Sequence, residues 1–116
     1  MRNLVFLVLV MACGSVLGQD TLTRYFHPNG RVSSEGMLVD GKPEGWWRTY
    51  SDNGELRSAG NRKGFKLDSL WSFYDEKGRL TSRINYRDDA KDGLVTRYDT
   101  TGAVISEEAY ANDLKE

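Results

Sequence analysis

Apolar and polar positions along this chain repeat with a period of 24 residues. When the chain is written in rows that begin at Leu22, Trp46, Leu70 and Leu94, the same residue class occupies the same column without a gap. The columns hold aromatics at Phe26, Tyr50, Tyr74 and Tyr98, glycines at Gly30, Gly54, Gly78 and Gly102, branched aliphatics at Val32, Leu56, Leu80 and Val104, and serines at Ser34, Ser58, Ser82 and Ser106. The chain therefore divides into the units 22–45, 46–69, 70–93 and 94–116.

Within each unit the pattern predicts a β-hairpin. In the second unit an aromatic and β-branched segment, 46–50, is followed by the turn signal 52–54 and by a second alternating segment, 55–59. Gly54 supplies the positive φ that a three-residue loop with a type I turn and a bulge requires. This turn would pair Tyr50 with Leu56.

Following the pleat back from that turn places Arg48 opposite Ser58 and Trp46 opposite Gly60. The indole would then lie over a residue that has no side chain, which explains a glycine inside a strand. Gly36 opposite Leu22 repeats the arrangement, whereas the later units carry Ile84 and Glu108 in the glycine column.

The segment that closes each unit, such as 39–45, is polar and rich in glycine, and we expect a surface loop there. The predicted fold is all-β: an open, twisted antiparallel meander of four hairpins, with closure into a barrel as the lesser alternative. Its eight strands are expected near residues 22–26, 31–38, 46–50, 55–62, 70–74, 79–86, 94–98 and 103–110.

The first 18 residues predict a signal peptide rather than part of the fold. Arg2 is followed by an apolar run, 4–12, that would span only about 14 Å as a helix, less than half of a bilayer core. Val16 and Gly18 suit cleavage before Gln19, which leaves 19–116 as the repeat domain. Residues 10–13 also resemble a lipobox, so lipidation at Cys13 is the alternative. Both routes predict an exported protein, either periplasmic or secreted, or an outer-membrane lipoprotein.

Composition narrows the function classes. The 116 residues carry 16 Lys+Arg against 17 Asp+Glu, for a net charge of −1, which argues against a nucleic-acid partner. Cys13 is the single cysteine and lies in the leader, so no disulfide can stabilise the exported domain. Its stability must come from backbone pairing and side-chain packing.

The second unit resembles the MORN-repeat variant in its bacterial form, in which an aromatic strand, an Asn-Gly turn and a Leu-x-Ser strand follow one another. The resemblance extends over the whole of 19–116. Lys77 and Thr101 replace the turn asparagine, and Leu22 replaces the first aromatic, departures that we expect to weaken the end hairpins. The second unit carries the match at Gly45, Trp46, Trp47, Tyr50, Asn53, Gly54, Leu56, Ser58 and Gly60, and the third at Leu70, Trp71, Tyr74, Gly78, Leu80, Ser82 and Tyr86.

This resemblance implies a non-enzymatic sheet that binds proteins or is placed near membranes. Many bacterial members are labelled antitoxin-like, so a protein that neutralises a toxin is the alternative function, and a membrane-surface binding module is the second alternative. Binding to a membrane surface has little support from the sequence, because basic residues alternate with acidic ones in the domain.

Side chains able to carry out catalysis are sparse. His27 is the one histidine, and its place in the first turn predicts a solvated turn residue rather than a metal ligand or general base. Glu44, Asp68 and Asp92 recur once per unit, which favours hydrogen bonding to backbone N–H groups over an acid–base pair. We therefore expect no enzyme activity, no catalytic residue, no metal site and no cofactor.

The two faces of the predicted sheet differ. One face, which carries Trp46, Tyr50, Leu56, Leu70 and Tyr74, is expected to be the packed one. The opposite face gathers aromatic side chains rimmed by arginine, a composition typical of interface hot spots. Its candidate binding residues are Trp47, Trp71, Phe73, Arg57 and Arg83.

That aromatic face has two interpretations. Either the sheet curls so that the face closes on itself or on a second copy, or the face binds a different protein. The open edge strands at both ends offer another route to a partner. We expect a monomer or weak dimer that acts by binding a protein of the envelope or the medium.

Overall fold

The computed structural model describes residues 9–10 and 20–116. Most of the predicted leader, the cleavage point after Gly18, and Cys13 lie outside the described residues. Of the leader, only the short strand β1 (Leu9–Val10) is described.

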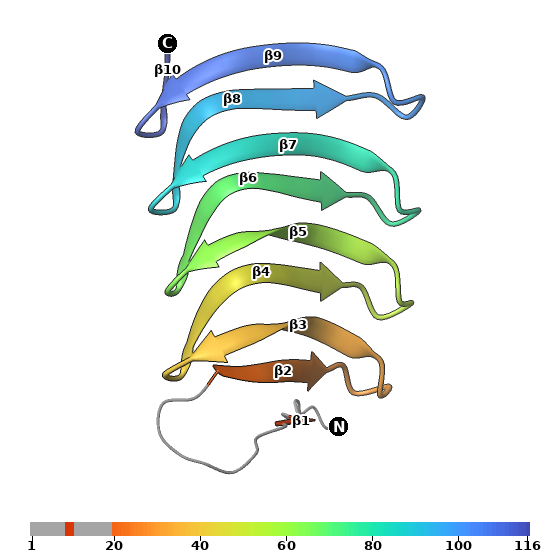
Figure 1. Cartoon of the computed structure of the whole chain (residues 1–116). Coiled ribbons are helices and arrows are strands. Elements are labelled where there is room, and N and C mark those ends of the chain that lie inside the picture. Colours follow the sequence, from red (N-terminus) through yellow and green to blue (C-terminus); the bar gives the residue numbers. More distant parts are fainter. Residues whose placement is uncertain (1–8, 11–19) are drawn as a thin grey trace.

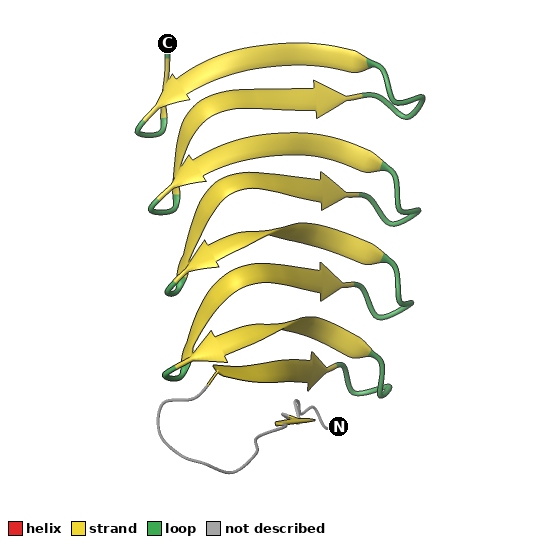
Figure 2. Cartoon of the chain, viewed as in Figure 1, coloured by secondary structure: helices red, strands yellow, loops and turns green. Residues whose placement is uncertain are grey.

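The described residues form one antiparallel sheet in which each strand pairs with its neighbours in sequence, from β1 to β10 (Figure 1). The first and last strands do not meet, so the sheet is open, and Figure 2 shows strands and loops but no helix in the described part of the chain. The predicted all-β open meander is confirmed. The eight long strands are β2 (Asp20–Phe26), β3 (Val32–Val39), β4 (Lys42–Tyr50), β5 (Leu56–Lys63), β6 (Lys66–Tyr74), β7 (Leu80–Arg87), β8 (Ala90–Tyr98) and β9 (Val104–Ala111), followed by the short β10 (Leu114–Lys115).

One feature of the units differs from the expectation. Strands β4, β6 and β8 each begin four residues earlier than predicted, and the segment read as a loop at 39–45 is mostly strand. The connection is a two-residue turn at Asp40-Gly41, with φ of 53° and 79°. Both values are positive, as a type I′ turn requires, and this turn matches the twist of the two strands that it joins.

The longer turns agree with the prediction. In the second unit the N–H of Ser51 donates to the carbonyl of Glu55 (2.9 Å), and the N–H of Gly54 donates to the carbonyl of Ser51 (3.0 Å). Gly54 has a φ of +94°. The other three units repeat both bonds within 0.1 Å, with their turn glycines also at positive φ.

The absence of the turn asparagine from the last two units has a structural compensation. In the second unit Asn53 Oδ1 accepts from the N–H of Glu55 (2.9 Å). In the third unit Asp75 Oδ1 accepts from the N–H groups of Lys77 and Arg79 (2.8 and 2.9 Å), and Asp99 takes the same role in the fourth. The N–H of Arg79 is the main cause that lowers the pKa of Asp75, and a threonine hydroxyl, followed by the backbone N–H groups, lowers the pKa of Asp99. In the last two units the side-chain acceptor is therefore the aspartate at the start of the turn instead of the asparagine in its middle.

A bulge beside each longer turn sets which side chains share a face. Tyr50 pairs with Leu56 as predicted, but Thr49 pairs with Ser58, so Arg57 is an extra residue on its strand. Everything beyond it is shifted by one position relative to the expected register: Arg48 lies opposite Ala59 and Trp46 opposite Asn61, instead of Ser58 and Gly60. A one-residue shift exchanges the faces of a strand.

A second bulge bends strands β4, β6 and β8 near their starts, as Figure 1 shows. Gly36 pairs with Trp47 and Met37 with Glu44, so Gly45 and Trp46 lie between consecutive pairs. Gly45 has a φ of +86°, and Ser69 and Gly93, one and two units later, have φ of 64° and 113°. This left-handed backbone explains why that column holds small residues.

Hydrogen bonds also join equivalent turns of successive units. His27 Nε2 lies 2.9 Å from the carbonyl oxygen of Tyr50, and Asn29 Nδ2 donates to the carbonyl of Asp52 (2.8 Å). At the opposite end of the strands, the N–H of Leu67 donates to Asp89 Oδ1 (2.7 Å), and the N–H of Asp89 donates to the carbonyl of Leu67 (3.1 Å). The repeat is therefore fixed along both margins of the sheet.

Candidate functional site

Side chains of one face, which we call the indole face, form most of the core. The apolar side chains Trp47, Trp71, Ile84 and Val95 are 5%, 2%, 8% and 1% exposed. They lie in one row across the strands, because Trp71 pairs with Ile84 and Ile84 with Val95. The expectation that the face with Trp46 is the packed one is wrong: Trp46 is 53% exposed and Leu70 is 42% exposed. The bulge beside each longer turn is the physical reason, because it shifts Gly60 and Ile84 to the face of Trp47 and Trp71, where the indoles pack.

Each buried indole lies against a glycine of the preceding strand. A Cβ on Gly36 would lie 2.2 Å from Cδ2 of Trp47, and a Cβ on Gly60 would lie 2.2 Å from Cδ2 of Trp71. The predicted relation between indole and glycine is therefore present, but the tryptophan is Trp47 or Trp71 rather than Trp46.

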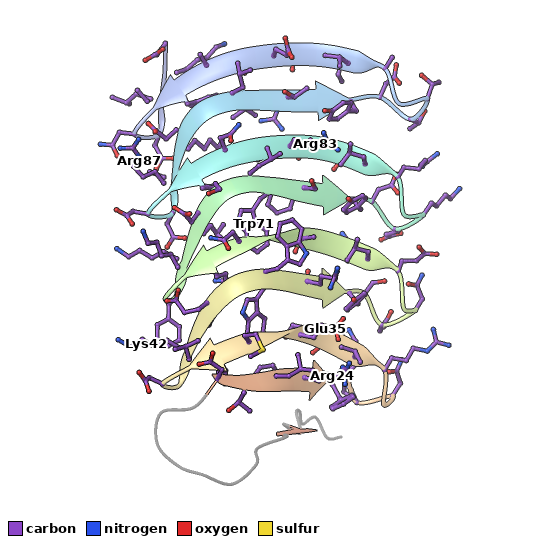
Figure 3. The ribbon with its side chains drawn as sticks, in the orientation of Figure 1. Arg24, Glu35, Lys42, Trp71, Arg83 and Arg87 are labelled. Atoms are coloured by element: carbon purple, nitrogen blue, oxygen red, sulfur yellow. The ribbon has the colours of Figure 1, made fainter. Side chains whose placement is uncertain are left out.

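Polar and aromatic contacts hold both indoles in place. Trp47 Nε1 donates to the carbonyl of Met37 (3.1 Å), and Trp71 Nε1 donates to the carbonyl of Asn61 (2.8 Å). Trp71 stacks on Phe73 with ring centroids 6.3 Å apart, and the Arg62 guanidinium lies 5.5 Å from the indole centroid of Trp71. Figure 3 shows Trp71 over the middle of the sheet.

The structure brings together only part of the candidate binding set. Trp71 and Phe73 are in contact, and Trp47 lies in the same row, but both indoles are too buried to meet a partner without rearrangement. Arg57 occupies the bulge and donates from Nε to the carbonyl of Tyr74 (3.2 Å). Arg83 pairs with Ser72, one position from Ile84, and so projects from the opposite face.

A shallow groove of about 220 Å³ remains above Trp47 on the indole face. Tyr25 stacks on Trp47 with ring centroids 6.5 Å apart, and Pro43, Arg62 and Phe65 contribute to the other wall. The lining of the groove extends from Tyr25, near one end of the strands, to Gly41, in the turn at the other end.

The opposite face, which we call the leucine face, exposes one large apolar side chain per unit. Leu22, Trp46, Leu70 and Leu94 are 44%, 53%, 42% and 48% exposed. They occupy one column of the 24-residue repeat. Sequence reasoning assigned Trp46, Leu70 and Leu94 to the packed face, and the repeat column was the signal that could have marked the four side chains as one row.

A charged cluster on the leucine face was not anticipated. Glu35 accepts from the Tyr50 hydroxyl (2.5 Å) and from Arg24 Nε (2.9 Å), and Figure 3 shows Arg24 and Glu35 side by side. The Tyr50 hydrogen bond lowers the pKa of Glu35, partial burial opposes it, and Arg24 lowers it further. Burial and then the Glu35 carboxylate raise the pKa of Tyr50. Together with Arg31 these residues line an open cleft of about 450 Å³.

The carboxylates that recur once per unit serve the backbone of the next unit in two cases. Glu44 Oε2 accepts from the N–H of Gly64 (2.6 Å), and Asp92 Oδ1 accepts weakly from the N–H of Asn112 (3.4 Å). Asp68 instead accepts from Asn61 Nδ2 and from the Ser69 hydroxyl. Within the described residues no three His, Cys, Asp or Glu side chains converge as a metal site would require, and no helix there is long and apolar enough to cross a membrane.

The comparisons with known proteins add no relative. The chain matches no family model, and neither the curated proteins nor the solved structures contain a match to it. The resemblance to MORN repeats therefore rests on the sequence columns alone.

Proposed function

We propose that this chain is a non-enzymatic, exported repeat protein that acts as a protein-binding scaffold in the bacterial envelope or outside the cell. The observation that carries the proposal is the exposed row Leu22, Trp46, Leu70 and Leu94 on the leucine face. Equivalent side chains on alternate strands recur at about 9.6 Å, so the four apolar side chains form a regularly spaced series across the sheet.

Large apolar side chains that recur at regular spacing on one exposed face favour contact with another protein, since such contact removes apolar surface from water. Tryptophan is enriched at the positions that contribute most to such contacts. The row alone does not specify the partner, and a toxin masked by this face would use the same side chains.

The test compares substitutions on and off the row. Trp46→Ser and Leu70→Ser together should abolish recovery of partners from an envelope fraction while the melting temperature stays near that of the wild type. Ile105→Ser is the matched control, because Ile105 is 62% exposed but lies outside the row. Equal recovery by all three proteins would refute the proposed face. Tight one-to-one binding to a single toxic protein would replace the scaffold with the immunity function.

Export has its own test. Intact mass of the protein recovered from a bacterial host should correspond to a chain that begins at Gln19, or at a lipidated Cys13. A product that keeps residues 1–18 would contradict export by either route.

A further inference from the structure

Among the described residues, strand β2 is covered on its outer edge by the short strand β1 alone. Its seven residues meet β1 at only two positions, where Leu9 pairs with Arg24 and Val10 with Thr23. Cleavage before Gln19 or before Cys13 would remove β1 in either case. The whole outer edge of β2 would then be open, and an open edge pairs readily with another strand.

The sequence of β2 is complementary to itself. In an antiparallel pair centred on Leu22, Asp20 of each copy lies opposite Arg24 of the other, and Thr21 lies opposite Thr23. Opposite charges and threonine pairs in these positions stabilise neighbouring strands. Asp20, Leu22 and Arg24 share the leucine face, so both ion pairs and the central leucine contact form on the same side of the sheet.

The side chains are disposed to make these contacts. Asp20 is exposed, and Leu22 is 44% exposed. Among the described residues, Glu35 binds Arg24 through its Nε atom, so the terminal amino groups of the guanidinium are the donors that a second carboxylate would use. Asp20 of a second copy would therefore extend the existing ion pair to three groups.

The opposite edge of the sheet keeps its short outer strand, β10, when the leader is removed. The chain turns back after β9, so that Leu114 and Lys115 of β10 pair with Ala111 and Tyr110. Glu108 forms an ion pair with Lys115 (3.0 Å). Antiparallel self-pairing about the middle of β9 would be centred on Glu107 or on Glu108, and either register places a glutamate opposite the same glutamate of the other copy. Like charges that lie opposite each other in this way oppose the pairing of two β9 edges.

We infer that, after removal of the leader, two copies of this chain join through β2 into one continuous antiparallel sheet with two-fold symmetry. The inference rests on the export in the proposed function and names a second copy as one partner. Such an interface is isologous, because the same strand serves on both sides.

The experiment expresses the full chain in a bacterial host and measures the exported product by intact mass and by sedimentation. The processed wild type should be a dimer. Asp20→Lys and Arg24→Glu should each weaken the dimer at least about tenfold, because each places like charges opposite each other twice. Mixing the two variants should restore a dimer, since both ion pairs then join opposite charges. Glu107→Lys, a charge reversal on the opposite edge, is the control and should leave the dimer unchanged.

Arg24→Glu also places a carboxylate near Glu35, so Leu22→Glu provides a second disruption that leaves the Arg24–Glu35 pair intact. A processed chain that stays monomeric would overturn the inference while leaving export in place. A dimer whose stability is unchanged by Asp20→Lys and by Leu22→Glu would also overturn the inference. A product that retains residues 1–18 would overturn the inference and the export proposal together, and the intact mass distinguishes these results.

Discussion

The indole of Trp71 lies so close to Gly60 on the neighbouring strand that a Cβ added to Gly60 would lie 2.2 Å from the ring atom Cδ2. One unit later the same two columns hold Val95 and Ile84, which are also paired across strands. The pairing of a glycine with a tryptophan between the second and third units is thus replaced by two side chains of middle size between the third and fourth. The combined side-chain volume of the two paired columns is therefore maintained, while the volume in each single column changes from unit to unit.

Gly60→Ala should therefore destabilise the fold by about 1–3 kcal/mol, because the extra methyl group forces the indole out of place. Gly60→Ile should cost more. The double variant Gly60→Ile, Trp71→Val reproduces the Ile84–Val95 pair, which joins the third and fourth units, and should be more stable than Gly60→Ile alone. Urea unfolding of the wild type, Gly60→Ile, Trp71→Val and the double variant measures the coupling, and additive effects would contradict the maintained combined volume.

Adjacent tryptophans should respond very differently to the same change. Trp47 is 5% exposed and Trp46 is 53% exposed. Trp47→Ala should cost about 3–5 kcal/mol, because it leaves a cavity against Gly36. Trp46→Ala should cost less than about 1 kcal/mol, as at other exposed positions. Chemical unfolding compares the two, and similar losses would show that the faces are assigned wrongly.

These differences mark how far the sequence predicts this fold. The turn at Gly54 and the pairing of Tyr50 with Leu56 were predicted because both depend on residues a few positions apart. The faces were not, since the bulge at Arg57 shifts every later pair by one and no residue type at that column announces it. The candidate site was affected by the same shift: Trp47 and Trp71 were candidate binding residues on a face that either closes or binds a partner, and with Gly60 and Ile84 on their side they form the core.

The start of β4 was missed for a different reason. Pro43 and Gly45 are typical of loops, yet Pro43 pairs with Leu38 near the beginning of its strand, and Gly45 sits in a bulge. Both residues are tolerated at such positions. The Asp40-Gly41 pair was the available signal for a two-residue turn.

Ser69 has a φ of 64°, a left-handed backbone conformation that costs a residue with a side chain roughly 1 kcal/mol. Gly45 and Gly93 occupy the same column. Ser69→Gly should therefore raise the free energy of unfolding, by up to about 1 kcal/mol. Ser69→Ala is the control, because it also loses the hydroxyl bond to Asp68 but keeps the strain. Equal stability of the two variants would argue against strain at this residue.

The third longer turn should be sensitive to acid. The N–H of Arg79 is the first cause that lowers the pKa of Asp75 from its usual 3.8, so the carboxylate contributes stability above that value. This contribution is lost as the pH falls through the lowered pKa of the folded state. Asp75→Ser should destabilise the protein at neutral pH, and the difference from wild type should shrink on acidification.

Asp75→Ser combined with Lys77→Asn gives the third turn the Ser and Asn residues of the second turn. Because Asn53 Oδ1 accepts the equivalent N–H there, the double variant should regain the lost stability at neutral pH. Its stability should also no longer depend on the charge at residue 75. Melting temperatures of the three proteins at neutral and acidic pH test this, and a double variant as weak as the single one would contradict the exchange of acceptors.

The hydrogen bonds that join successive turns connect residues 22 or 23 positions apart, and every described strand pairs only with its neighbours in sequence. Within the described residues, the strand pairing and these hydrogen bonds therefore do not depend on how many units the chain contains. An additional 24-residue unit inserted in frame would meet the same partners at both margins and lengthen the sheet by about 9.6 Å. The number of 24-residue units therefore sets the width of the sheet, while β2 and β9 stay its outermost long strands whatever that number is.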